Sequence, residues 1–217
     1  LVLGIDPVEL GGAPFALTLD TAVNCLAQEV GLRFNAATRV YLLPCIAGHV
    51  GADAAGAVLA EAPQDSEEIT LLIDIGTNAE IILGNCHHLM AASSPTGPAF
   101  EGAQISSGQR AAVGAIERVR INPNNYEPIY KVIGSDQWSD SADFLEEVKK
   151  TGLTGICGSG IIEIIAEMYL AGIISEDGVI NGALSSKTKR IEKFGRTFCY
   201  KVTEQIAITQ ADVRAIQ

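Results

Sequence analysis

The stretch that most constrains the fold is Leu71–Asn85, LLIDIGTNAEIILGN, in which two apolar segments flank the turn Gly76-Thr77-Asn78. The pattern predicts a β-hairpin with Asp74 at the end of its first strand. The turn glycine lets backbone N–H groups approach an anion closely, Thr77 adds a hydroxyl donor, and Asp74 can hold a metal ion directly or through water. The same residues also fit a tight hairpin that binds no ligand.

Composition places the chain among globular α/β proteins. Its 217 residues, 47% of them hydrophobic, suffice for one or two domains with a proper core. The 26 acidic and 15 basic residues give a net charge of −11. An acidic surface repels nucleic acid and anionic membranes, so we expect neither as a partner. No apolar run reaches the ~18 residues typical of a membrane-spanning helix.

The five cysteines are scattered and include no C-x-x-C pair. This odd, dispersed set, with no preceding signal-peptide pattern, predicts reduced thiols and a cytoplasmic protein. It also predicts no zinc or iron–sulfur site within these residues.

The first third of the chain predicts a helix over Thr21–Val30, a strand over Thr38–Leu43 and an Ala/Gly-rich helix within 45–62. His49 and Asp53 are four residues apart, so they share one face if that helix has already begun. They are then either a polar pair directed into a cleft or an exposed pair near the helix start.

The polar, acidic segment Pro63–Glu68 is the best candidate for a hinge or linker. After the hairpin, His87–Ala92 predicts a third strand. On a strand the adjacent His87 and His88 face opposite sides and cannot share a metal ion, and we expect one to be exposed and the other partly buried.

Ser93–Gly102 is rich in Gly, Pro and hydroxyl residues and predicts a loop, followed by one or two helices interrupted at Gly108 and Gly114. Glu101 lies just before that helical stretch. Its carboxylate could orient a water or a metal ion beside a phosphate, or simply complement a helix dipole.

A second signal lies in TGICGSGIIEIIAEMYLAGII, residues 154–174, where glycines lead directly into an apolar helix. Such a lead fits an anion or nucleotide site at the helix N-terminus, and equally close helix–sheet packing without a ligand. Cys157 is either a thiol of lowered pKa at this helix start or a small buried residue.

Shorter patterns predict strands at 130–134 and 198–202, a helix over 141–150, and a helix opened by a capping box from Thr209 to Asp212. The abrupt apolar start, and the end soon after that cap, lead us to expect a fragment cut from a larger protein.

Two levels of resemblance follow from these motifs. IDIGTNAEIILGN resembles the second phosphate-binding hairpin of the actin, sugar-kinase and heat-shock-chaperone ATPase superfamily. More narrowly, an ordered set of segments resembles the reductive activators of corrinoid proteins: LGIDPVELGGAPF, LPCIAGHVGADAAGAVLA, LLIDIGTNAEIILGN, SSPTGPAFEGAQISSGQRA with GAIERV, and TGICGSGIIEIIAEMYLAGII.

The resemblance implies an α/β fragment of an actin-like (ribonuclease H-like) ATPase, with a mixed sheet flanked by helices. Residues 1–68 would be the remainder of the first lobe with the inter-lobe helix, and 69–217 the second lobe. It implies ATP-dependent reduction of a corrinoid protein from cob(II) to cob(I), with Mg²⁺ as the nucleotide's metal ion. An iron–sulfur cluster would belong to an N-terminal domain absent here.

The resemblance also implies roles for individual residues. The hairpin group would hold phosphate and magnesium, with Asp74 as metal ligand: Asp74, Gly76, Thr77 and Asn78. A second group would lie beside the nucleotide, with Glu101 catalytic: Gly97, Pro98, Ala99, Glu101 and Gly102. A third would direct backbone N–H groups to it: Gly155, Gly158, Ser159 and Gly160. Asp53 would be the carboxylate that orients the attacking water.

The family's first phosphate hairpin and its later adenosine loop are absent from these residues, so we expect weak or no nucleotide binding by them alone. Two other functions remain open: a small-molecule kinase of the same superfamily, and a non-catalytic module that binds a partner. The partners considered are a corrinoid protein and, in a homodimer, a second copy of the chain.

Overall fold

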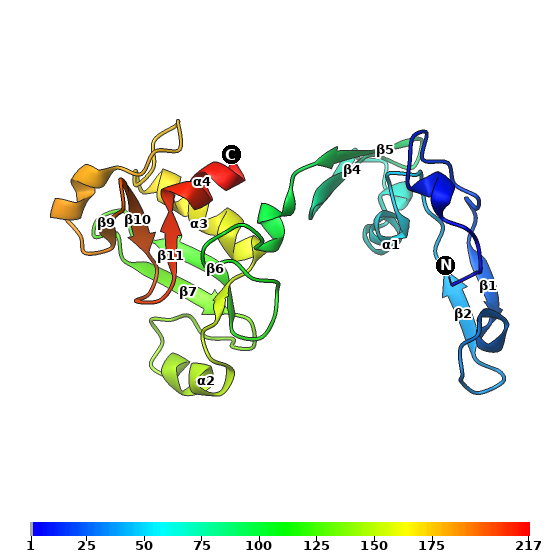
Figure 1. Ribbon diagram of the computed structural model, residues 1–217, viewed down its shortest axis with the longest axis horizontal. Coiled ribbons are helices and arrows are strands. Elements are labelled where there is room, and N and C mark those ends of the chain that lie inside the picture. The colour runs from blue at the N-terminus through cyan, green and yellow to red at the C-terminus, as the bar shows by residue number, and fades with distance from the viewer. Residues whose placement is uncertain (1) are drawn as a thin grey trace. The chain divides into compact units, whose positions relative to one another are not determined.

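The computed structural model describes residues 2–217, which divide into two compact units, one ending at Pro95 and one running from Thr96 to Gln217 (Figure 1). Each contains strands and helices, which confirms the predicted α/β class. Pro63–Glu68 is not a free linker: its Ser66 carbonyl accepts a 2.8 Å hydrogen bond from the Cys86 N–H. Among the described residues, no helix is both long and apolar enough to cross a bilayer.

The first unit begins with a 3₁₀ turn, η1 (Val8–Leu10), and an antiparallel ribbon of β1 (Val23–Leu26) and β2 (Arg39–Leu42). The strand prediction for β2 is confirmed, whereas the helix predicted over Thr21–Val30 is wrong. Val23 pairs with Leu42 across the ribbon, and this tertiary pairing overrides a short helical periodicity. Only the last four residues of the segment are helical, and they form the 3₁₀ turn η2 (Ala27–Val30).

The predicted hairpin is confirmed as β3 (Thr70–Ile75) and β4 (Asn78–Gly84), and β5 (Leu89–Pro95) completes an antiparallel sheet. The 3₁₀ turn η3 (Pro63–Asp65) precedes it. One face of the sheet, through Ile82, packs on Val50 and on Ala54 of α1 (Ala52–Glu61). His87 and His88 precede β5, and both are exposed in the turn, so our expectation of opposite strand faces is wrong.

The second unit is built on the sheet β7-β6-β8, of β6 (Ala115–Ile121), β7 (Pro128–Val132) and the short parallel β8 (Gly155–Ile156). The helices predicted after Gly102 are wrong. Along β6, Val119 and Ile121 are buried while Arg118 is exposed. This alternation has the period of a strand. The residues around Gly108 and Gly114 form turns instead of the predicted helices.

Helix α3 (Gly158–Leu170) packs on β6, and α2 (Phe144–Thr151) matches the short helix predicted there. Ile161, Ile164 and Met168 form the buried face of α3. At Gly160 a methyl group would overlap the carbonyl oxygen of Ile116, so this glycine permits the close approach of helix and strand.

The rest of the unit is η4 (Pro98–Glu101), η5 (Gly182–Ser186) and the antiparallel sheet of β9 (Ile191–Phe194), β10 (Thr197–Lys201) and β11 (Ala207–Thr209). Helix α4 (Gln210–Ile216) follows β11 (Figure 1). It carries the predicted capping box. Tyr200 of β10 is fully buried and donates a 2.9 Å hydrogen bond to the Tyr126 carbonyl, which ties this sheet to the β6–β7 turn.

Candidate functional site

The tip of the β3–β4 hairpin presents its polar groups to solvent. The Gly76 N–H donates a 2.8 Å hydrogen bond to the Asn78 carbonyl and closes the turn. Asp74, Thr77 and Asn78 are exposed. Asp74 is the direct register partner of Glu80, whose carboxylate accepts a 3.0 Å hydrogen bond from the Ser93 hydroxyl. The turn is therefore pre-shaped, and its side chains are accessible to a ligand.

Two carboxylates of this hairpin lie on one face of the sheet, a donor set that is compatible with a hydrated magnesium ion. Across an antiparallel pair, register partners project from the same face, so Asp74 and Glu80 share one side of the sheet. Within residues 2–217, no three His, Cys, Asp or Glu side chains converge as a metal cluster. Mg²⁺ keeps several waters and needs only one or two carboxylates together with substrate phosphates.

His49 and Asp53 are not the helical pair that their spacing allows. Helix α1 begins at Ala52, so His49 lies in the preceding loop, with its ring 4.1 Å from that of Phe15. Asp53 is exposed in the first turn, and its Oδ1 accepts a 2.9 Å hydrogen bond from the Ala54 N–H.

His49 lies near the hairpin through the loop before α1, and not as part of the α1 helix. An open cavity of about 520 Å³ is lined by both His49 and Asn78, together with Ser93 and Pro95. The sequence offered no signal for this juxtaposition, because it depends on how the loop before α1 packs on the sheet.

In the second unit, the predicted loop contains the short turn η4, bounded by Gly97 (φ +86°) and Gly102 (φ +82°). Pro98 opens the turn, Ala99 is buried beneath it and Glu101 is exposed. The Gly102 N–H donates a 3.0 Å hydrogen bond to the Ala99 carbonyl. The turn therefore displays the Glu101 carboxylate on a fixed backbone.

Gly155, before α3, and Gly158, its first residue, allow that loop to lie against the start of the helix. A methyl group at Gly158 would overlap the Phe100 carbonyl oxygen, and one at Gly155 would lie 2.8 Å from the Ser107 carbonyl oxygen. Both glycines thus serve close backbone packing, one of the two roles considered for them. The structure gathers the second and third predicted groups in this unit, whereas Asp53 and the hairpin group belong to the first.

Cys157, the N-cap residue of α3, and Ser159, in its first turn, differ in exposure. Ser159 is exposed, and its Oγ lies 3.3 Å from the Cys157 sulfur. Cys157 is 1% exposed and lies 3.3 Å from the Ile116 carbonyl oxygen, to which its thiol donates. The buried thiol, rather than an accessible nucleophile, is therefore the interpretation that the structure supports.

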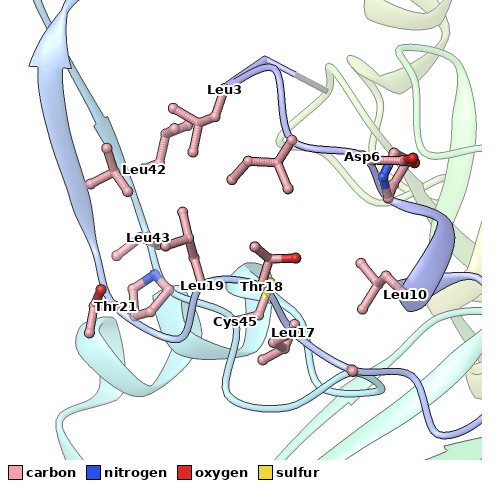
Figure 2. Close-up of a pocket in the computed structure, with 15 residues that line it drawn as sticks. Leu3, Asp6, Leu10, Leu17, Thr18, Leu19, Thr21, Leu42, Leu43 and Cys45 are labelled. Carbon is pink, nitrogen blue, oxygen red and sulfur yellow. The ribbon is translucent and has the colours of Figure 1, made fainter.

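A separate cavity of about 200 Å³ lies in the first unit among the N-terminal loops and β2 (Figure 2). Figure 2 shows a wall rich in leucine, including Leu3, Leu10, Leu42 and Leu43, with Asp6 at one side. Of the residues that the structure places around it, none belongs to the predicted nucleotide groups. Its apolar lining suits packing better than phosphate chemistry.

Two family profiles match this chain. A profile described as the C-terminal domain of RACo, the ASKHA domain, matches residues 68–217, and one described as the RACo middle region matches residues 1–65. The ASKHA domain is the actin-like type, so the fold expected from the resemblance is confirmed.

Two known proteins that resemble this chain in sequence also have names that refer to corrinoid proteins. The chain is 36% identical over 230 residues to a corrinoid activation enzyme, RamQ, of Eubacterium limosum, covering 100% of this chain and 36% of that protein. It is 29% identical over 164 residues to a [Co(II) methylated amine-specific corrinoid protein] reductase of Methanosarcina barkeri, covering 72% of this chain and 30% of that protein.

A solved structure is also similar. The reductive activator for a corrinoid, iron-sulfur protein superimposes with a TM-score of 0.78 at 33% identity, covering 99% of this chain and 33% of that one. The chain thus spans about a third of the length of the proteins it matches.

Proposed function

This chain belongs to the family of reductive activators of corrinoid proteins, and from that membership we propose that it forms part of the ATP-binding domain of an enzyme that reduces a corrinoid protein from cob(II) to cob(I). The observation that carries the proposal is the hairpin tip, where a tight glycine turn and the exposed Asp74, Thr77 and Asn78 offer donors and a carboxylate at one place.

The hairpin is proposed to bind the nucleotide phosphates. Backbone N–H groups near Gly76 and the Thr77 hydroxyl would donate to phosphate oxygens, and Asp74 would hold Mg²⁺ through its waters. The ion would neutralise charge on the phosphates. His49 and Asn78 line the same cavity, so an imidazole is available beside the phosphates as a further donor.

The second unit is proposed to supply the remaining nucleotide contacts. Gly97–Gly102 and the residues at the start of α3 lie together there, and Glu101 is the exposed carboxylate among them. In this role Glu101 accepts a proton from, or orients, the water that attacks the terminal phosphate. Asp53 remains the second candidate for that role. The division into lobes 1–68 and 69–217 stays part of the proposal.

Reduction of cob(II) to cob(I) adds one electron to cobalt, and the proposed donor is the iron–sulfur domain that the family resemblance implies. Nucleotide binding and hydrolysis, with closure of the two lobes, would make this uphill transfer favourable. The substrate and binding partner is then a corrinoid protein.

The test is calorimetry of Mg-ATP binding to the full-length gene product and to its Asp74→Asn variant. The substitution preserves shape and removes the charge, so we expect binding to weaken by at least about tenfold. Asp65→Asn, at an exposed position in η3, is the matched control and should bind as the parent does. Equal affinity in the parent and Asp74→Asn would refute the role of the hairpin, and no binding by either protein would favour a non-catalytic module.

A further inference from the structure

Asp212, in the first turn of α4, is a buried carboxylate that forms no ion pair within residues 2–217. Its residue is 2% exposed. Burying an unpaired charge is costly unless several hydrogen bonds compensate it. The hydrogen-bond donors to Asp212 therefore identify the segments that its carboxylate holds together.

The two carboxylate oxygens of Asp212 have different partners. Oδ2 accepts from the N–H and the hydroxyl of Thr209, each at 2.8 Å, and so closes the capping box of α4. Oδ1 accepts from the N–H of Ser106 at 2.7 Å and from its hydroxyl at 3.1 Å. One oxygen thus serves the helix, and the other reaches a loop that is 106 residues away in sequence.

That loop continues directly from the η4 turn. Next to Ser106, the Ser107 hydroxyl donates to the Ala207 carbonyl and accepts from the Ala207 N–H, each at 3.3 Å. A methyl group at Gly108 would overlap the Gly102 carbonyl oxygen, so the two ends of the loop are in backbone contact. Movement at Ser106 would therefore be transmitted to Gly102 and Glu101.

We propose that Asp212 is a positioning residue that fixes the segment Gly97–Gly108, and with it the Glu101 carboxylate, for nucleotide binding. The inference rests on the proposed function of that segment. Charge-assisted hydrogen bonds are stronger than neutral ones, so a carboxylate restrains the Ser106 backbone more firmly than an amide could. The α4 cap and the loop then share one buried group.

Three variants of the full-length gene product separate the two halves of this network. Asp212→Asn retains the size of the side chain but replaces one acceptor oxygen with a donor amide, which cannot accept from both pairs of donors. Ser106→Ala removes only the loop hydroxyl. Thr209→Ala removes the cap hydroxyl and the γ-methyl group and is the control. It weakens α4, while the Thr209 N–H still donates to Oδ2 and the bonds from Ser106 go to Oδ1.

Two measurements follow on each variant: hydrogen exchange of the peptide containing Ser106, and the Kd for Mg-ATP at a temperature where circular dichroism shows the fold intact. Asp212→Asn should speed exchange of the Ser106 amide and raise the Kd by about tenfold, with a smaller change in Ser106→Ala. Thr209→Ala should lower the Tm and leave the Kd within about twofold.

The outcomes distinguish this inference from the proposed function. If the parent protein binds no Mg-ATP, the proposed function fails, and the positioning inference for nucleotide binding fails with it. If the parent binds and Asp212→Asn loosens the loop without changing the Kd, only the positioning inference is overturned. An equal rise in Kd for Thr209→Ala and Asp212→Asn would also overturn it, since the effect would then reflect the stability of α4.

Discussion

The carboxylate of Glu163 on α3 accepts a 2.6 Å hydrogen bond from the backbone N–H of Val119 on β6. One turn later, Glu167 accepts from the N–H of Ile121 at 2.9 Å. Strand β6 pairs with β8 only at Ala115 and Ile116, so these N–H groups lie beyond the end of the neighbouring strand. Two helix carboxylates thus take the place of a strand along this edge.

Glu163→Ala should destabilise the protein by ~1–3 kcal/mol, because it leaves the Val119 N–H unpaired and removes the ion pairs to Arg118 and Arg120 at 2.8 and 2.7 Å. Urea unfolding of the 217-residue chain, followed by the fluorescence of Trp138, its single tryptophan, measures this change. Glu146→Ala is the control, since its pair with Lys149 is fully at the surface and should contribute under ~0.5 kcal/mol. Equal losses in both variants would refute the edge role.

The same carboxylate should make stability depend on acid pH. Burial raises the pKa of Glu163, but hydrogen bonds from Arg120, the Val119 N–H and Arg118 outweigh it, so the pKa lies below its usual value. The contribution of Glu163 is therefore complete above the unfolded pKa of about 4.3 and is lost as the pH falls through the lower folded value. Glu163→Gln should flatten this part of the pH profile of unfolding; a profile as steep as the parent's would contradict the assignment.

Substitution by alanine should destabilise the protein at Gly160 in α3 but not at Gly56 in α1. Gly160→Ala places a methyl group against the Ile116 carbonyl and should cost ~1–3 kcal/mol. At Gly56 in α1, the nearest neighbour of an added methyl is the flexible end of Leu43 at 3.4 Å. Gly56→Ala should therefore be neutral or stabilising by up to ~1 kcal/mol, because alanine favours the helix. Thermal unfolding by circular dichroism tests the contrast, which fails if both variants shift the Tm in the same direction.

Tyr200 should contribute to alkaline unfolding. Burial raises the pKa of its hydroxyl well above the usual value, so the folded state keeps it neutral. Above the unfolded pKa of about 10, the unfolded chain loses this proton more readily, and stability falls as the pH rises. Tyr200→Phe should reduce the slope between pH 10 and 11, and at neutral pH it should cost ~1–2 kcal/mol for the lost bond to the Tyr126 carbonyl. An unchanged slope would contradict a buried, neutral hydroxyl.

Segments with a strong local pattern could be predicted from the sequence. The hairpin around Asp74, the Gly-led helix α3 and the capping box at Thr209 each carry turn or cap residues at the required spacing. The errors arose where periodicity was short. Val23–Leu26 and Ala115–Ile121 fit helical spacing in part, and their strand pairing with distant segments decided the outcome.

The candidate site likewise contains parts that the sequence predicts and parts that it does not. Local motifs identified the hairpin tip, the η4 turn and the glycines before α3, because their chemistry lies in consecutive residues. The approach of His49 to Asn78, and the bond between Asp212 and Ser106, could not be predicted, since each joins segments that are remote in sequence. The sequence predicts Asp212 only as a capping residue, whereas its Oδ1 also accepts the hydrogen bond from the distant Ser106.

The most direct test of the central claim is the absorption spectrum of a cob(II) corrinoid protein mixed with the full-length gene product and a low-potential electron donor, with and without Mg-ATP. We expect the cob(I) spectrum to develop only when Mg-ATP is present, and to be abolished by Asp74→Asn but not by Asp65→Asn. Reduction at the same rate without nucleotide, or no reduction in any mixture, would contradict an ATP-dependent corrinoid activator.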